Sequence, residues 1–345
     1  MKIEENIPLA PFTTFGIGGP ARYFVEVSSE SDLRNAIDYS HSKNLPIFIL
    51  GGGSNLVVSD AGFNGLVIRM AIRGIDESSD RGKRLLQTGA GEDWDAFVAH
   101  AVEENCAGIE CLSGIPGTVG ATPVQNVGAY GQEVSDTITQ VYALEMSTQL
   151  IRELTPEQCG FAYRTSVFNT TQKDRFIILG VRFSLTPNGE PKIEYRDLQK
   201  HFGDRKPTLK EVRDAVREIR HSKGMLIVEG DEDCRSAGSF FKNPIVSAAK
   251  FAEVQQIAEG RGLTNIPSFP AENGQVKIPA AWLVEQSGFH KGFVKGAAGI
   301  SRRHSLAIIN RGGAKASDIL ALKDDIQRGV MDQFGIELKP EPVFL

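Results

Sequence analysis

The chain has 345 residues, 41% hydrophobic and 23% charged, which is an ordinary globular composition at a length that predicts two or three domains. Its net charge of −5 argues against a nucleic-acid partner. The N-terminus holds no apolar run long enough for a signal peptide, so we expect a cytoplasmic protein without a membrane span. The cysteines form no CxxC pair and no ligand spacing with histidine, which predicts reduced thiols, no disulfide and no metal: Cys106, Cys111, Cys159 and Cys234.

The first predicted elements are a strand, a helix and a second strand. Residues 22–27 alternate between apolar and polar side chains, as a strand does. Ser29 with Asp32 resembles a capping box, which opens a helix that ends near Asn44. Residues 45–50 are a continuous apolar run of strand length, so the segment predicts a βαβ unit.

A glycine-rich loop, Gly51-Gly52-Gly53-Ser54-Asn55, follows the second strand directly. Main-chain N–H groups in such a loop can bind an anion, although the spacing matches neither the Walker motif nor GxGxxG. The loop is therefore a phosphate-binding loop or a tight glycine turn. Residues 13–20 are also glycine-dense, and are either an ordered lead-in or part of the same site.

The next segment predicts two strands and a helix. Residues 65–73 and 85–91 have strand character, and the polar residues 76–83 between them predict a surface turn. A helix is expected from Asp93 to Gly108. Its apolar face predicts core side chains: Trp94, Phe97, Val98, Ala101 and Val102.

Residues 111–132, CLSGIPGTVGATPVQNVGAYGQ, contain no charged residue. Their glycines and prolines exclude a membrane span, since lipid tolerates no unpaired backbone. The missing Cβ atoms let the main chain contact a flat object, at Gly114, Gly117, Gly120, Gly128 and Gly131. A phosphate would have drawn lysine or arginine here, so a neutral planar ligand such as flavin fits better. The alternative is a loop that packs on its own core.

The remaining segments predict further strands and helices. Strands are expected over 138–144, 176–185 and 305–310, and helices near 247–260, 279–288 and 317–334. Residues 204–207 predict a linker, after which Thr208 with Glu211 caps a helix. The basic face of that helix is interpreted as mostly solvated: Arg213, Arg217, Arg220 and Lys223. Ser317 is predicted as the N-cap of the last helix and Gly335 as its C-terminal stop.

Three polar residues in the later motifs have two interpretations each. Arg164 in CGFAYRTSVF is a solvated charge or a ligand-binding cation. Ser239 in AGSFFKNP is a turn residue or a functional hydroxyl, and Glu341 in the apolar tail is either exposed or deliberately placed.

These motifs together carry a resemblance. GGGSN, SGIPGTVGATPVQNVGAYGQE, CGFAYRTSVF, AGSFFKNP and a final Lys-Pro-Glu occur in this order, and the second and fourth are highly specific. From about residue 7 to its end the chain resembles the UDP-N-acetylenolpyruvoylglucosamine reductases of peptidoglycan precursor synthesis, in their longer form. The acid-rich residues 224–235 and Pro342 depart from the motif of that family.

The resemblance implies an α+β fold with an FAD-binding module of the vanillyl-alcohol-oxidase type and a smaller α+β substrate-binding domain. We expect residues 1–70 and 71–206 to be the two FAD-binding lobes. Residues 207–335 are expected to form the substrate domain, with 336–345 as a tail that returns to the active site.

The resemblance also implies non-covalent FAD, NADPH as the reductant and a UDP-sugar as the substrate, with no obligate protein partner evident. The expected FAD-binding residues are Gly51, Gly52, Gly53, Ser54, Asn55, Ser113, Gly114, Ile115, Pro116, Gly117, Gly120, Ala121, Gln125, Asn126, Gly128, Ala129 and Tyr130. The expected substrate-binding residues are Tyr163, Tyr195, Lys223, Lys242 and Asn243.

The implied reaction reduces the enolpyruvyl ether of UDP-N-acetylglucosamine to UDP-N-acetylmuramate. A hydride passes from flavin N5 to C3, and negative charge then develops on C2 and its carboxylate. By resemblance, Arg164 and Glu341 stabilise this enolate and Ser239 gives a proton to C2. A different flavin oxidase would lack the serine, and a non-catalytic nucleotide-binding regulator would lose all of these residues.

Overall fold

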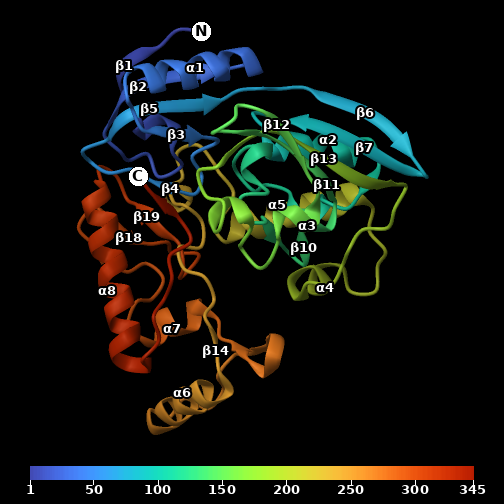
Figure 1. Ribbon diagram of the computed structural model, residues 1–345. Coiled ribbons are helices and arrows are strands. Elements are labelled where there is room, and N and C mark those ends of the chain that lie inside the picture. Colours follow the sequence, from blue (N-terminus) through green and yellow to red (C-terminus); the bar gives the residue numbers. More distant parts are fainter. The chain divides into compact units, whose positions relative to one another are not determined.

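The structure is a computed structural model that describes residues 1–345, and it divides into two compact units (Figure 1). Unit 1 consists of Met1–Ile7, Ala21–Gly53 and Phe63–Ser222. Unit 2 consists of Pro8–Pro20, Ser54–Gly62 and Lys223–Leu345. Compactness thus divides the chain at points other than the four predicted parts, and the assignment of those parts to FAD and substrate stays a prediction.

The first sheet of unit 1 contains the predicted βαβ segment. Its strands, in spatial order, are β1 (Glu4–Pro8), β2 (Pro20–Val27), β5 (Phe63–Met70) and β3 (Ile47–Leu50). β5 pairs in parallel with both β2 and β3. Helix α1 (Glu30–Ser42) connects β2 to β3, and the side chain of Ser29 accepts a hydrogen bond from the Asp32 N–H at 3.1 Å. The predicted cap at Ser29 is therefore confirmed, although the reciprocal bond of a capping box is not formed.

The second sheet of unit 1 is antiparallel. Its strands, in spatial order, are β12 (Ile151–Leu154), β11 (Ile138–Glu145), β13 (Phe176–Pro187), β7 (Lys83–Gly89) and β6 (Ile75–Asp80), and β8 (Cys106–Ala107) also pairs with β13. The predicted surface turn over 76–83 is wrong, because most of it is strand β6. This edge strand is exposed along most of its length, so main-chain pairing with β7 holds it and no apolar alternation marks it.

Helix α2 (Trp94–Glu103) fills the core of unit 1. Asp93 caps its first turn by accepting from the Ala96 N–H at 2.8 Å. The five apolar residues predicted for the core are all buried. The helix ends five residues before the predicted stop at Gly108, because Asn105 adopts a left-handed φ of 53° and the next residues pair with β13.

Three further helices complete unit 1: α3 (Pro156–Cys159), α4 (Arg196–Phe202) and α5 (Leu209–Ser222). The predicted cap of α5 is confirmed, since Glu211 accepts from the Thr208 N–H at 2.7 Å and donates its own N–H to the Thr208 hydroxyl at 3.2 Å. The predicted linker over 204–207 lies between α4 and α5.

Unit 2 packs three helices with short strands. The helices are α6 (Ala248–Gly260), α7 (Ala280–Gln286) and α8 (Ala316–Phe334). One sheet has β17 (Val294–Lys295), β18 (Ala298–Ile300) and β19 (Ile308–Asn310), and a second has β14 (Ile245–Val246), β16 (Val276–Lys277) and β15 (Phe269–Pro270). Buried side chains from α7, α8 and the first sheet form one core with Phe15, Phe240 and Phe334.

The tail of the chain returns to a segment far away in sequence. Strand β20 (Val343–Phe344) pairs in parallel with β4 (Leu56–Val57), directly after the glycine loop. No helix of residues 1–345 has the length and apolarity needed to cross a bilayer.

The two ends of α8 have different outcomes. Gly335 ends the helix with a φ of 59°, as predicted. Ser317 is not the N-cap, because Lys315 holds that position and donates its N–H to the Asp318 side chain at 2.9 Å. The N–H groups of Ala316 and Ser317 donate to the carboxylate of Asp60, at 2.7 and 3.1 Å. The acceptor comes from a residue about 250 positions earlier, so no local pattern could indicate it.

Candidate functional site

Within unit 1, Gly51 and Gly52 of the glycine loop, residues 51–55, contact the glycine stretch, residues 111–132. A Cβ atom on Gly52 would lie 2.5 Å from the Cα atom of Gly117, and one on Gly51 would lie 2.7 Å from the Thr118 hydroxyl. The N–H groups of Gly52 and Gly53 donate to no main-chain carbonyl. The missing side chains therefore allow the contact, and they leave N–H groups available to an anion.

This arrangement fits a dinucleotide cofactor with a flat neutral ring. The available N–H groups of the glycine loop suit a phosphate, and the uncharged main chain of the glycine stretch suits the ring. Part of the stretch also packs on its own core, which was the alternative interpretation. A Cβ atom on Gly120 would lie 2.5 Å from that of Ala90, so core packing alone requires glycine there.

A buried carboxylate fastens the two ends of the glycine stretch. Glu110 is fully buried and accepts from the Gln132 side chain at 2.9 Å and from the Lys192 N–H at 3.0 Å. The Gln132 side chain in turn accepts from the Cys111 N–H at 2.8 Å. Ser113 is also buried and donates to the Glu110 carbonyl at 2.6 Å. These bonds rigidify the stretch.

The basic face of α5 contacts the start of the glycine stretch, so its interpretation as a mostly solvated face is wrong. Asp95 on α2 accepts from Arg213 at 2.6 and 3.1 Å, from Arg217, and from the Gly114 N–H at 2.6 Å. Arg220 donates to the Gly114 carbonyl at 3.0 Å. Both main-chain polar groups of Gly114 are thus held by charged side chains from two helices.

The ionisation of this cluster follows from its contacts. Burial acts to raise the pKa of Asp95, but the hydrogen bonds from Arg213 and Gly114 and the charges of Arg213 and Arg217 bring it below its usual value. Burial lowers the pKa of Arg220, against the attraction of Tyr130 and Asp95. The ring of Tyr130 meets that of Tyr195 edge-on, with 5.3 Å between centroids. Tyr195 therefore lies beside the end of the stretch.

Arg164 lies against the predicted flavin-binding main chain. Its guanidinium donates to the Gly128 carbonyl at 2.5 Å and to the Asn126 carbonyl at 3.4 Å, and it lies 5.3 Å from the centre of the Tyr163 ring. Its φ of 53° is a strained backbone conformation of the kind that clusters at functional sites. The structure favours a placed cation over a solvated charge.

In unit 2, hydrogen bonds connect Glu341 to Asn55 and to Phe240, the residue after Ser239. The Phe240 N–H donates to the Leu306 carbonyl at 2.8 Å, and its carbonyl accepts from the Glu341 N–H at 2.8 Å. The Asn55 side chain donates to the Glu341 carbonyl at 3.2 Å. Glu341 is therefore held at the serine turn, residues 237–244, and its neighbour Pro342 is buried.

The serine turn also contains a residue that the sequence did not indicate. The hydroxyl of Ser239 lies 3.3 Å from Nε2 of His304. Sixty-five positions separate the two residues, and a histidine in SRRHSLAI has no motif that would mark it.

Two of the residues predicted to bind substrate, Asn243 and Lys242, form hydrogen bonds within unit 2. The side chain of Asn243 accepts from the Ala280 N–H at 2.9 Å and so caps α7. The Lys242 N–H donates to the Lys339 carbonyl at 3.0 Å, and Lys223 is the first residue of unit 2 after α5. Their roles toward substrate stay predictions.

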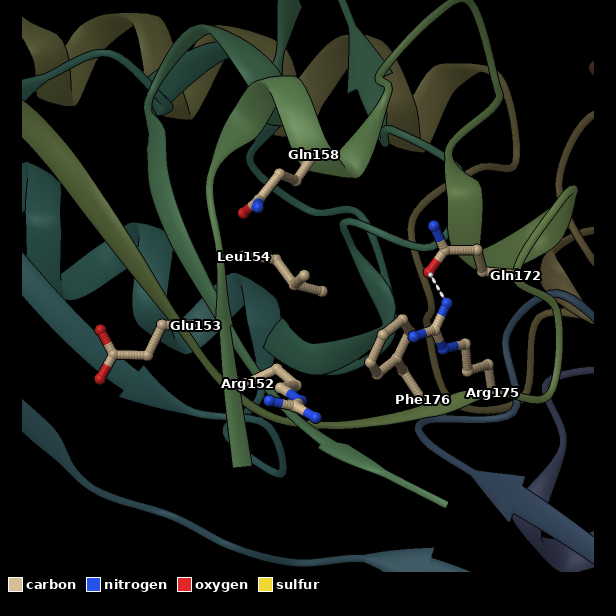
Figure 2. A pocket seen from close by; sticks show the side chains of 7 residues that line it. All are labelled: Arg152, Glu153, Leu154, Gln158, Gln172, Arg175 and Phe176. Carbon is tan, nitrogen blue, oxygen red and sulfur yellow. Dashed lines mark hydrogen bonds between the residues drawn. The ribbon is translucent and has the colours of Figure 1, made fainter. Parts of the chain in front are cut away.

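A separate hollow in unit 1 contains none of the predicted residues. Figure 2 shows the side chains that line it: Arg152, Glu153, Leu154, Gln158, Gln172, Arg175 and Phe176. Arg152 and Arg175 each bind the buried Glu145 through two nitrogens, at 2.6 to 3.0 Å. Hydrogen bonds from Arg152, Arg175 and Thr148 lower the pKa of Glu145 to about 2. This ion pair ties together the strands of the antiparallel sheet.

Comparison with known proteins gives a consistent result over the whole chain. Residues 21–152 match the FAD binding domain family, and residues 230–345 match the UDP-N-acetylenolpyruvoylglucosamine reductase C-terminal domain family. The chain is 46% identical to the UDP-N-acetylenolpyruvoylglucosamine reductase of Thermobifida fusca, over 99% of this chain and 97% of that protein. It is 43% identical to that of Saccharopolyspora erythraea, over 98% and 94%.

A solved structure agrees with these relatives. The crystal structure of the UDP-N-acetylenolpyruvylglucosamine reductase from Thermus caldophilus matches with a TM-score of 0.67 and 26% identity. It covers 100% of this chain and 99% of its own.

Proposed function

The chain belongs to the UDP-N-acetylenolpyruvoylglucosamine reductase family, and on that premise we propose that it reduces UDP-N-acetylglucosamine-enolpyruvate to UDP-N-acetylmuramate with NADPH. The family predicted from the motifs is confirmed, as is an α+β fold with an FAD-binding domain. The protein is thus an FAD-containing oxidoreductase of peptidoglycan precursor synthesis, and a non-catalytic regulator is set aside.

FAD, when bound, supplies the redox chemistry of the reduction. The glycine loop would hold its phosphates through main-chain N–H groups, and the glycine stretch would hold its ring. Neither region contains a histidine, and Cys111 of the glycine stretch is buried and donates its thiol to the Lys192 carbonyl at 3.2 Å, so we propose a non-covalent complex.

The observation that carries the proposed mechanism is the position of Arg164 on the carbonyl of Gly128. The reduction develops negative charge on the substrate carboxylate. The planar fork of arginine binds a carboxylate through two parallel hydrogen bonds and stabilises this charge. A cation fixed to the flavin-binding main chain is suited to that role.

We assign the remaining chemistry to two residues of unit 2. Ser239 gives its proton to C2 of the substrate, and Glu341 assists Arg164 at the developing enolate, a role that requires a protonated carboxyl group that can donate a hydrogen bond. A hydroxyl is a weak acid, so this transfer needs a strongly basic acceptor and support around the serine oxygen. We assign substrate binding to five residues: Tyr163, Tyr195, Lys223, Lys242 and Asn243. The two lysines suit the diphosphate of the substrate.

The test separates the two half-reactions. Ser239→Ala should leave reduction by NADPH nearly unchanged and should slow reoxidation by the enolpyruvyl sugar about 10²–10⁴-fold, the usual contribution of a general acid. Arg164→Lys should slow the same half-reaction, because a point charge replaces the fork. Stopped-flow absorbance at the flavin band measures each half separately.

Ser236→Ala is the matched control, because Ser236 accepts from the Gly238 N–H at 3.1 Å and thus supports the same turn without touching the substrate chemistry we propose. It should slow neither half-reaction as strongly. If Ser239→Ala slows both halves equally, or neither, the assignment of the proton donor is wrong.

A further inference from the structure

We propose that His304 is a positioning residue that donates a hydrogen bond from Nε2 to Ser239, so that the proton of the serine stays directed away from the imidazole. This inference rests on the proposed role of Ser239 as the proton donor. It follows from a pair of contacts, one on each nitrogen of the imidazole ring.

The first contact fixes the tautomer. The Leu306 N–H donates to Nδ1 of His304 at 3.1 Å, so Nδ1 presents a lone pair and carries no proton. A neutral imidazole with an unprotonated Nδ1 carries its proton on Nε2. Protonating Nδ1 would set two donors against each other and remove this hydrogen bond.

The second contact gives the direction of the hydrogen bond to the serine. Nε2 of His304 lies 3.3 Å from the Ser239 hydroxyl oxygen. Because Nε2 carries the proton, the imidazole donates and the serine oxygen accepts. The arrangement is the reverse of a nucleophilic serine, in which the histidine takes the hydroxyl proton. Here the hydroxyl proton remains available for transfer to carbon.

This direction supports the proposed proton transfer. The O–H bond of Ser239 breaks and a C–H bond forms at C2, where the electron pair of the carbanion takes the proton. The electron pair of the O–H bond stays on the serine oxygen as an alkoxide. The Nε2–H of His304 stabilises that charge, and water then returns a proton to the oxygen.

The acid-rich segment that departs from the family motif holds the loop of His304. Asp233 accepts from the Arg302 N–H at 2.9 Å and from its side chain at 3.3 Å, and Asp231 binds Arg303. Asp233 is buried, so its bond from the Arg302 N–H is shielded from water. The two residues before His304 are therefore fixed by residues 231–233.

The residues after His304 join it to the serine turn. The Ala307 N–H donates to the His304 carbonyl at 3.1 Å. The Leu306 carbonyl accepts from the N–H of Phe240, the residue next to Ser239, at 2.8 Å. Leu306 thus binds the imidazole through its N–H and the serine turn through its carbonyl, which sets the distance between His304 and Ser239.

The first experiment reads the tautomer directly. ¹⁵N-histidine NMR of the purified FAD-loaded protein, with His304 assigned by its absence in His304→Gln, should show a protonated Nε2 and an unprotonated Nδ1. Ser239→Ala should shift the Nε2 resonance and leave Nδ1 nearly unchanged. A proton on Nδ1, or a spectrum insensitive to Ser239→Ala, overturns the proposal whatever the activity.

The second experiment uses a matched pair of variants. His304→Leu removes the donor and should slow reoxidation by the enolpyruvyl sugar roughly 10- to 100-fold, the effect of one hydrogen bond to a charged atom. His304→Gln keeps an N–H donor and should restore most of that rate. Reduction by NADPH and FAD content should change little in either variant.

The two failures are distinguishable. If Ser239→Ala has no effect on reoxidation, the proposed proton donor itself is wrong. If Ser239→Ala has its full effect while His304→Leu matches the wild type, only the role of His304 is wrong. If His304→Gln is as slow as His304→Leu, the histidine acts through its bulk, and donation from Nε2 is not its contribution.

Discussion

In unit 1 the glycine stretch presents main chain to its surroundings, whereas in unit 2 the serine turn presents a side chain. The stretch contains no charged residue, and charged side chains from other elements hold it, such as Asp95 and Arg220 at Gly114. The serine turn is held by main-chain bonds at Phe240, and its functional group is the hydroxyl of Ser239.

The difference follows from what each region has to do. A surface for a flat cofactor requires that side chains be absent, so it depends on glycines and on charged residues of other elements. A proton donor requires one side chain in one orientation, so it depends on the hydrogen bonds of that side chain. The first region should be sensitive to added atoms and the second to lost donors.

The largest effect is expected from adding a side chain to the cofactor region. In Gly52→Val a Cβ atom would lie 2.5 Å from the Cα atom of Gly117, which neither backbone can relieve without moving. Overpacking of this kind costs about 1–3 kcal/mol or more. We expect most of the FAD to be lost, measured as absorbance released to the supernatant after acid precipitation.

Gly260→Ala serves as the control, because nothing lies within 4 Å of its added Cβ atom. It should keep full FAD content and near-native helix content. If Gly52→Val also keeps its FAD, then the two glycine regions are structural turns and do not form a cofactor surface.

A smaller effect is expected from removing a charge outside the glycine stretch. Asp95→Asn should leave Arg213 and Arg217 without their carboxylate, and should lower the free energy of unfolding by about 2 kcal/mol. Urea denaturation at pH 7 measures this change. Asp214→Asn on the exposed face of α5, where the carboxylate pairs with Lys210, should change it little.

The same variant has a predicted pH dependence. The pKa of Asp95 is lower in the folded protein than in the unfolded chain, so the carboxylate contributes stability above its unfolded pKa, about 3.9. That contribution is lost as the pH falls through the folded pKa. The difference between wild type and Asp95→Asn should therefore be full at pH 7 and shrink below about pH 4. A difference that stays constant down to pH 3 would contradict the ion pair.

The sequence predicted those parts of the fold that depend on local periodicity and capping. The helix after Ser29 and the buried face of α2 have such signals, and both are confirmed. Strand β6 has none, because an edge strand held by main-chain pairing needs no apolar alternation. Residue pairs that are distant in the chain, such as Ser239 with His304, could not be predicted because nothing in either segment indicates the other.

In the candidate site, too, residues within a motif could be predicted and contacts between distant elements could not. Family motifs indicated Arg164, and the structure places it on the carbonyl of Gly128. The arginines of α5 were interpreted as solvated because helical spacing alone makes a charged face look exposed. Their partner, Asp95, lies on another helix more than a hundred positions earlier.

The smallest effect is expected at the beginning of α8. It tests whether a carboxylate distant in sequence also organises local main chain in unit 2. Asp60 accepts from the N–H groups of Ala316 and Ser317, which a helix leaves unpaired at its first turn. Asp60→Ala should lower the free energy of unfolding by about 1 kcal/mol, the usual effect of losing an N-cap.

The control for Asp60→Ala is Ser317→Ala. If Ser317 were the N-cap of α8, Ser317→Ala would lower the free energy of unfolding more than Asp60→Ala does. Burial acts to raise the pKa of Asp60, but hydrogen bonds from Ser317 and Ala316 bring it below its usual value, so its stabilising effect should be present at pH 7 and fade as the pH falls below about 4. Ser317→Ala keeps both N–H donors to Asp60 and removes only the hydrogen bond from the Ser317 hydroxyl, so it should cost less than Asp60→Ala at pH 7. If Ser317→Ala is the more damaging, the carboxylate of Asp60 does not stabilise the first turn of α8.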